Sequence, residues 1–476
     1  MMKRLTGCAV MVAATSLMLS GCGGSSSSSS ATTGSATSAG GATTAAAAST
    51  SGATSTSPAS ASTSTSASSA SPSGQASSKA PQGGGPTTSI TFWNSFTSSD
   101  KPAVEALVKQ FNDSGQGVKV DMTVEPFDVL TQKLLPAYAA GQGPTITTLD
   151  ASQVPGIASK GVLASVDDLY GSSGLDPKTL PAASLASTMW QGKQYGVPFA
   201  AAGTMLYYNK KIFAAAGITN PPTTMDELAS DAVKTTKYTS GDQTKNTYGF
   251  IVPDHAAPAT WAVLLNSMGG NVVSDDGKSS EFDSPGTVKA MDFWTNLIIK
   301  NHISPAGLGG VDTDNLFAAG KAAMYINGPW ASSGFKTAGI DFGVVPVPAG
   351  SAMQTCTAVS SNMHLNAKAS TAQKAAAYKF FKFWNSAASQ TYWAIHSAYP
   401  PNLNTVPASA IAANPTSAAF LGAKGAKFYL PGIVNATQID SNVVVPIIQK
   451  VTEGKGTPEQ LLPDASKQIT ALLAGQ

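Results

Sequence analysis

The sequence predicts an α/β protein with two lobes, and three observations carry this prediction. Strand-like and helix-like segments alternate between residues 89 and 149, and the alternation returns from residue 205 onward. Alternation of this kind is typical of a parallel sheet with helices on both faces. The part after residue 88 has about 390 residues, which is more than one small hydrophobic core normally organises.

The N-terminus carries the parts of a secretory signal. Lys3 and Arg4 precede an apolar stretch at residues 5–19, and small residues stand directly before Cys22. A charged start, an apolar run of this length and a small-residue cut are typical of such a signal. Residues 19–22 (LSGC) resemble the bacterial lipobox, which implies a lipoprotein signal peptide at residues 1–21 and lipidation of Cys22. The alternative is a plain signal peptide that ends near a cysteine.

A low-complexity tract separates this signal from the folded part. Residues 23–88 consist almost wholly of Ser, Thr, Ala and Gly, with Lys79 as the only charge. Without large apolar side chains, the tract cannot bury enough surface to offset the entropy lost on ordering. We therefore expect residues 22–88 to be a disordered linker that is anchored by the lipid on Cys22.

Cysteine and arginine are both sparse. Cys8 leaves with the signal peptide and Cys22 would carry the lipid, so Cys356 has no partner for a disulfide or a cysteine-based metal site. The chain has 29 Lys and Arg against 27 Asp and Glu, and removing Lys3 and Arg4 leaves 27 of each. This balance gives no basic surface for nucleic acid. Arg4 is the only arginine, and its loss disfavours a phosphate or free acid as ligand.

The folded part is predicted to consist of short alternating elements. The expected strands are residues 89–93, 118–124, 145–149, 205–209, 322–326 and 342–347. The expected helices are residues 130–140, 224–235 and 375–384, together with helices that start after Asp100, Ser284 and Thr457. Asp100 is expected to cap the first helix, and Pro102 suits its first turn.

Five segments carry a more specific signature. They are residues 195–199 (YGVPF), 206–213 (LYYNKKIF), 221–228 (PPTTMDEL), 317–330 (FAAGKAAMYINGPW) and the C-terminal helix 457–472. Their order and spacing resemble the family 1 extracellular solute-binding proteins of ABC importers, the group that includes maltose- and multiple-sugar-binding proteins. The resemblance covers essentially all of the folded part.

This resemblance implies a type II periplasmic-binding-protein fold, in which two α/β lobes close around a ligand in the cleft between them. The chain would cross the hinge several times. One lobe is expected at residues 89–200 plus 358–400, and the other at residues 204–352 plus 405–476. The implied protein is a monomeric receptor, lipid-anchored at the outer face of the cell membrane. It would bind a neutral sugar or oligosaccharide and deliver it to ABC transporter permease subunits.

Several candidate ligand contacts follow the predicted strands, where ligands of open α/β sheets usually bind. A sugar presents apolar faces and hydroxyls, so its site needs aromatic rings and hydrogen-bonding side chains. Trp93, Asn94 and Ser95 follow the first strand, Glu125 ends the second and Asp150 follows the third. The structural alternatives are a buried aromatic at the first strand, a solvated acid at Glu125 and a helix cap at Asp150.

The Gly-Pro-Trp motif supplies the next candidates. In the family, the tryptophan of this motif stacks on sugar rings, which implies that role for Trp330, and Gly328 would keep the backbone close to the ligand. Gly203 lies in a run of small residues where the chain should first cross between the lobes. There, backbone amides can approach a ligand, although a hinge without ligand contact is the alternative.

The last candidates occupy regions that line the cleft in related proteins. Trp261 is one, with His255 as a weaker neighbour, and a core position is the alternative for Trp261. Tyr399 lies in the late hinge segment, where relatives often carry an arginine that this chain lacks. Tyr399 or Asn402 would then act as a neutral partner for the ligand.

The sequence carries no catalytic signature. Metal-protease, phosphate-loop and nucleophile-elbow motifs are absent, and the four histidines have no metal-like spacing. We therefore expect no catalytic residue, no metal and no cofactor. Two alternatives stay open: a receptor for glycerol-3-phosphate or a glycerophosphodiester, and a surface glycosidase or hydrolase. The latter needs two carboxyl groups about 5–10 Å apart across a pocket.

Overall fold

The computed structural model describes residues 87–97, 100–171, 173–240, 242–255 and 258–475. The signal peptide, the lipidation of Cys22 and nearly all of the linker lie outside these described residues. The described residues belong to one compact unit. Within its described part, no helix combines the length and the apolar character needed to cross a bilayer.

The first of two large sheets is mixed. Its strands are β1 (Thr88–Asn94), β2 (Val118–Val124), β3 (Ile146–Asp150), β6 (Gly196–Gly203), β11 (Cys356–Leu365) and β12 (Ala426–Phe428). The order is β12-β11-β3-β1-β2, and β6 also pairs with β11. β1 is parallel to β2 and β3, as predicted, but β11 is antiparallel to β3 and β6. The parallel pairing predicted from the alternating elements therefore holds for β1, β2 and β3, and the antiparallel β11 makes the whole sheet mixed.

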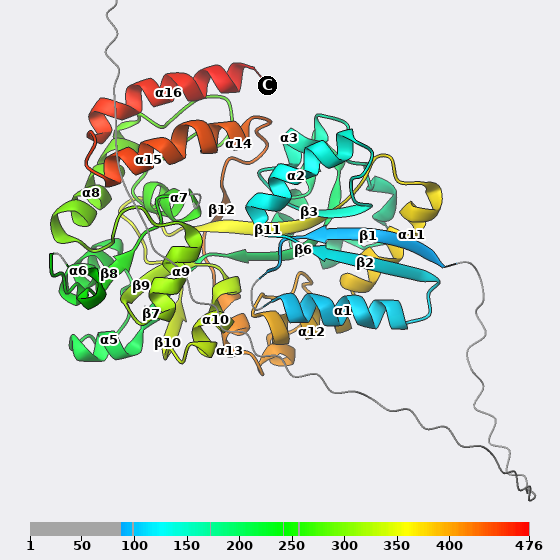
Figure 1. Ribbon diagram of the computed structural model, residues 1–476, viewed down its shortest axis with the longest axis horizontal. Helices are drawn as coiled ribbons and strands as arrows, with labels where there is room; N and C mark the ends of the chain where they lie inside the picture. Colours follow the sequence, from blue (N-terminus) through cyan, green and yellow to red (C-terminus); the bar gives the residue numbers. More distant parts are fainter. Residues whose placement is uncertain (1–86, 98–99, 172, 241, 256–257, 476) are drawn as a thin grey trace, which may run out of the picture. The chain divides into compact units, whose positions relative to one another are not determined.

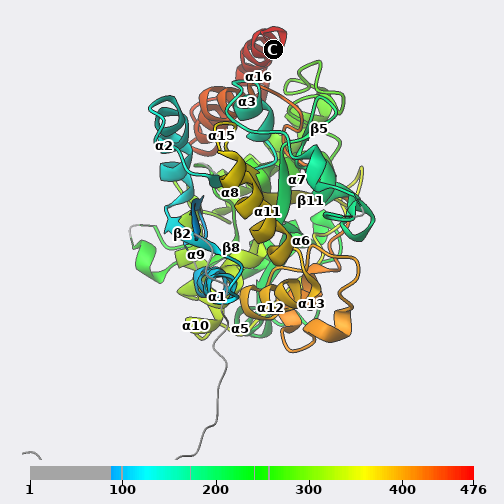
Figure 2. The ribbon, with the colours of Figure 1, turned by 90° about the vertical axis from the view of Figure 1, so that its right-hand side faces the viewer.

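Helices cover both faces of the first sheet because successive β1 side chains point to opposite sides. Phe92 packs into a cluster with Phe199 and Trp384, here called the first-sheet core, whereas Trp93 packs on the other face. The face with the first-sheet core carries α1 (Lys101–Asp113), α11 (Thr371–Trp384) and α12 (Ala387–Ser397). The other face carries α2 (Phe127–Ala139) and α3 (Val154–Ala158). Figures 1 and 2 show α1 and α12 on one side of the strands and α2 and α3 on the other.

The second sheet has four strands. In order they are β10 (Phe342–Val345), β7 (Met205–Asn209), β9 (Ala322–Asn327) and β8 (Tyr248–Ile251). One face carries the second-sheet core, a cluster around Trp261 and Trp294. It is covered by α6 (Met225–Thr235), α7 (Pro258–Ser267), α8 (Pro285–Asn301), α15 (Val445–Thr452) and α16 (Pro458–Ala474). On the other face, α9 (Gly310–Ala318) and α10 (Ser332–Thr337) pack around Tyr207 in what is called the Tyr207 core.

The chain passes between the two sheets three times. β6 of the first sheet leads into β7 of the second with only Thr204 between them. β10 of the second sheet is later followed by β11 of the first (Figure 1). Finally, β12 pairs with β11, and the chain returns through α14 (Ala436–Ile439) to the second-sheet core. The first passage falls where the small-residue run at residues 200–203 predicts it.

Most local predictions agree with the structure, with one exception in capping. α6 begins with a capping box between Thr224 and Glu227. α1 begins after Asp100, but the Asp100 side chain makes no capping hydrogen bond, so the predicted cap is wrong. Its backbone is already helical, with φ −84° and ψ −19°, whereas a capping residue normally has an extended backbone. The remaining short elements are α4 (Ala182–Ala186), α5 (Lys210–Ala215), α13 (Pro415–Phe420), β4 (Met189–Trp190) and β5 (Lys193–Gln194).

Candidate functional site

Trp330 lies where two hydrophobic clusters meet. It follows β9 in the 3-10 turn Pro329–Ala331, and its half-buried side chain packs against both the first-sheet core and the Tyr207 core. Gly328 makes this position possible, because a Cβ atom there would lie 1.8 Å from Cζ3 of the Trp330 ring. Only glycine lets the indole pack this closely on the backbone.

Tyr399 lies beside Trp330 although the two come from distant parts of the chain. Their ring centroids are 6.5 Å apart. Tyr399 also stacks on Trp393 at 5.4 Å and approaches Phe96 at 6.1 Å, so its ring is held by the first-sheet core. It is 7% exposed, and burial raises the pKa of its hydroxyl well above the usual value. Tyr399 therefore stays neutral and can both donate and accept hydrogen bonds.

Asp150 is one of two carboxyl groups, the other being the buried Asp100, whose charges act on the hydroxyl of Tyr399. It ends β3, pairs with Ser361 of β11, and is close enough for its charge to raise the pKa of Tyr399. Burial raises the pKa of Asp150 itself to about 7, and no Lys or His lowers it. Its backbone N–H donates to Oε1 of Gln153 at 3.0 Å. In the described part of the chain its carboxyl group forms no ion pair, so it is available to hydroxyl donors of a ligand.

Three predicted residues at the end of β1 behave differently from one another. Trp93 is half-buried on the α2 and α3 face of the sheet, together with Trp190 and Tyr195. Asn94 is fully buried, and its Oδ1 accepts a hydrogen bond from the Phe96 backbone at 3.2 Å. Asn94 thus fixes the turn that carries Ser95, which is half-buried.

Gly203 and Trp261 are placed by packing. A Cβ atom on Gly203 would lie 2.5 Å from Sγ of Cys356 and 2.7 Å from Cβ of Ala423, so this passage between the sheets has no room for a side chain. Trp261 is 1% exposed, and its indole N–H donates to the Pro253 carbonyl at 3.0 Å. The structure does not bring Trp261 together with Trp330 and Tyr399, because its whole side chain lies in the second-sheet core.

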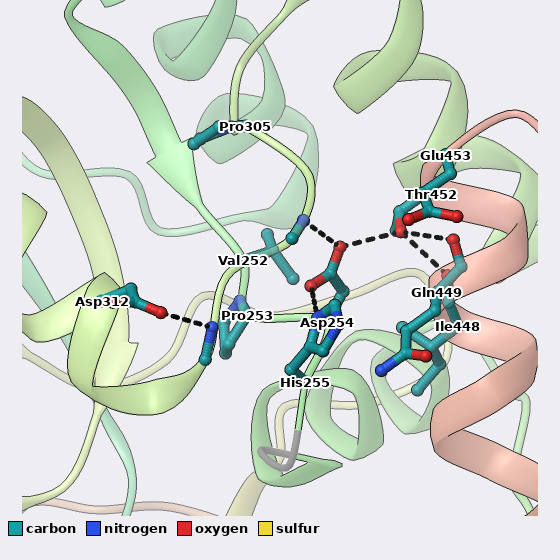
Figure 3. Close-up of polar contacts among 12 residues, drawn as sticks. Val252, Pro253, Asp254, His255, Pro305, Asp312, Ile448, Gln449, Thr452 and Glu453 are labelled. Atoms are coloured by element: carbon teal, nitrogen blue, oxygen red, sulfur yellow. Dashed lines mark hydrogen bonds and ion pairs between the residues drawn. The ribbon is translucent and has the colours of Figure 1, made fainter. Parts of the chain in front are cut away.

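His255 belongs to a different polar cluster, shown in Figure 3. Its Nδ1 lies 2.5 Å from Oδ1 of Asp254, and its own side chain is 44% exposed. The other oxygen of Asp254 accepts hydrogen bonds from the Gly307 N–H at 2.8 Å and the Thr452 hydroxyl at 3.0 Å. Asp254 thus ties the segment after β8 to residue 307 and α15, which indicates a structural role for this cluster.

The two weaker candidates differ in how they are engaged. Glu125 forms an ion pair with Lys133 at 2.7 Å. Asn402 is 1% exposed, and its backbone N–H donates to Oε1 of Gln390 at 2.7 Å. Glu125 therefore links the end of β2 to α2. The backbone of Asn402 secures the segment after Tyr399, whereas its buried Nδ2 has no hydrogen-bond partner among the described residues.

A separate cavity of about 230 Å³ lies between α7 and β12. It contains none of the predicted site residues. Its charged Lys427 pairs with Asp275 at 2.8 Å, and its Tyr429 hydroxyl donates to Asp440 at 3.0 Å. Because these groups are already paired, the cavity is a poorer ligand site than the surroundings of Trp330. Among the described residues, no group of three or more His, Cys, Asp or Glu is arranged to hold a metal ion.

Two residues of the site were missed from the sequence. Tyr207, in β7, donates its hydroxyl to the Gly328 carbonyl at 2.8 Å. Asn327 accepts the Gly328 N–H at 2.8 Å through its side-chain oxygen. Asn327 adjoins the motif and could have been suspected, but nothing local indicates Tyr207, which is 121 residues away.

Comparison with known proteins identifies the family of this chain. A family model described as bacterial extracellular solute-binding protein matches residues 106–419. The chain belongs to this family. That membership confirms the resemblance found in residues 317–330 and the other segments, and it makes this chain an extracellular binding protein rather than a member of an enzyme family.

This solute-binding protein also resembles individual relatives. A binding protein of Brucella abortus is 28% identical over 393 residues, which cover 79% of this chain and 91% of the relative. The maltotriose-binding protein of Pyrococcus abyssi is 27% identical over 259 residues, covering 54% of this chain and 53% of the relative. The GacH receptor of Streptomyces glaucescens, solved unliganded and with acarbose, aligns with a TM-score of 0.71 at 25% identity, covering 82% of this chain and 99% of that one. This likeness confirms the predicted two-lobed α/β fold.

Proposed function

We propose that this protein is the substrate-binding component of an ABC importer and that it binds a neutral sugar or oligosaccharide at Trp330, Tyr399 and Asp150. The observation that carries the proposal is the pair of aromatic rings 6.5 Å apart, together with the Asp150 carboxyl group, whose charge acts on the hydroxyl of Tyr399. Aromatic faces cover the apolar C–H surface of a sugar, and carboxylate oxygens accept its hydroxyl protons. Two relatives support the ligand class, since one is named for maltotriose and the other was solved with acarbose.

The other predicted positions fit around this group in different ways. Trp93 and Ser95 stay as ligand contacts at the end of β1. Asn94, Gly203 and Gly328 shape the backbone of the site, and we assign Trp261 a packing role. We assign one lobe to residues 89–200 plus 358–400 and the other to residues 204–352 plus 405–476, as the resemblance implies, with β12 of the last stretch pairing with β11 of the first sheet. The protein acts as a monomer without catalysis, and it hands its ligand to membrane permease subunits.

The ligand proposal is tested by titrating the protein from residue 23 onward with maltotriose, acarbose, maltose, glucose and glycerol-3-phosphate. Tryptophan fluorescence and calorimetry are suitable readouts, because Trp330 would lie against the ligand. We expect a saturable response to at least one sugar and none to glycerol-3-phosphate. Saturable binding of glycerol-3-phosphate alone would instead favour a phosphate-ester receptor, and no response to any sugar would refute the proposal.

Cys22 is proposed to anchor the protein at the outer face of the cell membrane. The linker that follows it would keep the binding unit near its permease and so raise its effective concentration there. Cys22→Ala is expected to abolish labelling by a radioactive fatty acid and to leave the protein unprocessed or released into the medium. Fractionation and immunoblotting measure this, with Cys356→Ala as the matched control that should stay anchored. A processed Cys22→Ala protein that remains on the membrane would contradict the proposed anchor.

A further inference from the structure

We infer that Asp314 and Asn327 form a positioning pair that sets the orientation of the Trp330 indole and thereby the affinity of the site. Asn327 acts through its hydrogen bond to the backbone of Gly328, and Asp314 acts through Asn327. The inference rests on the proposed function for its effect on affinity, whereas its effect on the orientation of Trp330 can be tested without any ligand.

Asn327 is held at both ends of its side-chain amide. It is 5% exposed and is the last residue of β9. Its Oδ1 accepts the N–H of Gly328 at 2.8 Å, and its Nδ2 donates to Oδ1 of Asp314 at 2.7 Å. Because one end must accept and the other must donate, only one orientation of the amide satisfies both neighbours. Asp314 therefore decides which way the Asn327 amide points.

The carbonyl group of Gly328 is also held by a hydrogen bond. It accepts the Tyr207 hydroxyl at 2.8 Å, so both polar backbone groups of this residue are fixed by buried side chains. The Trp330 ring lies directly on Gly328, since a Cβ atom there would be 1.8 Å from Cζ3. A small rotation of the Gly328 peptide must therefore move the indole. Displacements of about 1 Å matter because hydrogen bonds and stacking depend steeply on distance.

Asp314 is held by hydrogen bonds rather than by an ion pair in the described structure. It lies on α9, and it accepts hydrogen bonds from the side chains of Asn327 and Tyr325. Burial raises its pKa to about 6. The ionisable groups that face it are Tyr325 of β9 and Tyr207 of β7, and Lys336 of the adjoining α10 forms no ion pair with it in the described structure. Two neutral donors thus hold the carboxylate, so its hydrogen-bond geometry is more specific than a charge pair would be.

The decisive variants exchange donor and acceptor. Asn327→Asp removes the amide donor and places a second carboxylate against Asp314, and the two groups repel each other once both are ionised. At pH 7.5 we expect the Asp314–Asn327 link to break, with maltotriose binding weakened about tenfold. At pH 5 a shared proton restores the link, so the difference from the wild-type protein at the same pH should shrink. In the double variant Asp314→Asn/Asn327→Asp, the amide at position 314 donates to the carboxylate at 327, and binding should return to within about threefold of wild type.

A ligand-free readout separates this inference from the proposed function. Protein labelled with 5-fluorotryptophan has one 19F resonance for each of its 7 tryptophans, and Trp330→Phe identifies the one from Trp330. Asn327→Asp should shift and broaden that resonance at pH 7.5, and the double variant should restore it. Asn315→Asp is the matched control, because it makes the same chemical change at an exposed position of α9, the helix that carries Asp314. Circular dichroism establishes that each variant is folded.

Two outcomes would overturn the inference. One is a Trp330 resonance that is the same in Asn327→Asp as in Asn315→Asp. The other is a double variant that is no better than Asn327→Asp, since a general loss of packing would not be repaired by exchanging donor and acceptor. If Asn327→Asp does not fold at pH 7.5, Asp314→Ala removes the acceptor without adding charge, and a wild-type resonance in that variant would equally overturn the inference. If no sugar binds the wild-type protein, the proposed function fails while the 19F comparison still decides the positioning role.

Discussion

Trp330→Ala is expected to raise the Kd for the bound oligosaccharide about 100-fold, which corresponds to roughly 2.7 kcal/mol. Aromatic residues at the centre of a binding site commonly contribute 2 kcal/mol or more. Trp330 fits that description, because it lies between two hydrophobic clusters with Tyr399 beside it. Calorimetric titration with the sugar that binds the wild-type protein measures the effect.

The control for Trp330→Ala is Tyr238→Ala. Tyr238 is also aromatic, but it is 47% exposed and stacks on His302 at 3.8 Å, away from the proposed site. Gly328→Ala should reproduce the loss of affinity with Trp330 still present, because the new methyl group collides with the indole. Wild-type affinity in both Trp330→Ala and Gly328→Ala would exclude this region as the ligand site.

Asp150→Asn is expected to stabilise the ligand-free protein at pH 8 by roughly 2–4 kcal/mol, and the gain should vanish near pH 4. Burial raises the pKa of Asp150 from 3.8 to about 7. Between these values the folded protein holds a proton that the unfolded chain has released, so the wild-type protein loses stability as the pH rises through this window. Asparagine does not titrate and avoids that loss. Because Asp150 keeps part of its surface exposed, we expect the lower part of the range.

Urea unfolding of both proteins between pH 4 and 8 measures this difference. The buried imidazole of His364, whose pKa burial lowers to about 4, titrates in both proteins and cancels in the comparison. The same variant should bind its sugar more weakly at pH 8, because the carboxylate that accepts hydroxyl protons is gone. A constant stability difference across this pH range would contradict the proposed environment of Asp150. Stability gained together with affinity lost is the usual sign of a residue kept for function.

The strands that could be predicted from the sequence were those with a strong periodicity of apolar side chains. β1, β2 and β7 occupy the predicted residues to within one position, because their apolar side chains alternate or cluster. β11 was missed, since its sequence CTAVSSNMHL places polar side chains at buried positions. Those polar groups are satisfied by partners far along the chain, such as the Asn362 amide, which donates to the Ser187 carbonyl at 3.3 Å. No local rule can predict such a partner.

The candidate site also combines residues that a local motif predicts with residues that only the fold brings together. The Gly-Pro-Trp motif predicts Gly328 and Trp330 as site residues, and the strand-end rule predicts Asp150. The fold brings Tyr399 to Trp330 across 69 residues of sequence. Asn94 and Trp261 have the right chemistry for a ligand, but the first fixes a turn and the second is enclosed in the second-sheet core.

The sequence by itself determined the α/β class, the family and the choice of Trp330 as a candidate ligand contact, because these depend on periodicity and on a contiguous motif. Only the tertiary structure decided that β11 runs antiparallel to β3, and that Tyr207, Asn327 and Asp314 hold the backbone beneath Trp330. The physical reason is that a hydrogen bond or a ring contact depends on distance in space. The proposed ligand contact at Trp330 can therefore be predicted from a contiguous motif, whereas the contacts that hold its backbone form only when the chain folds.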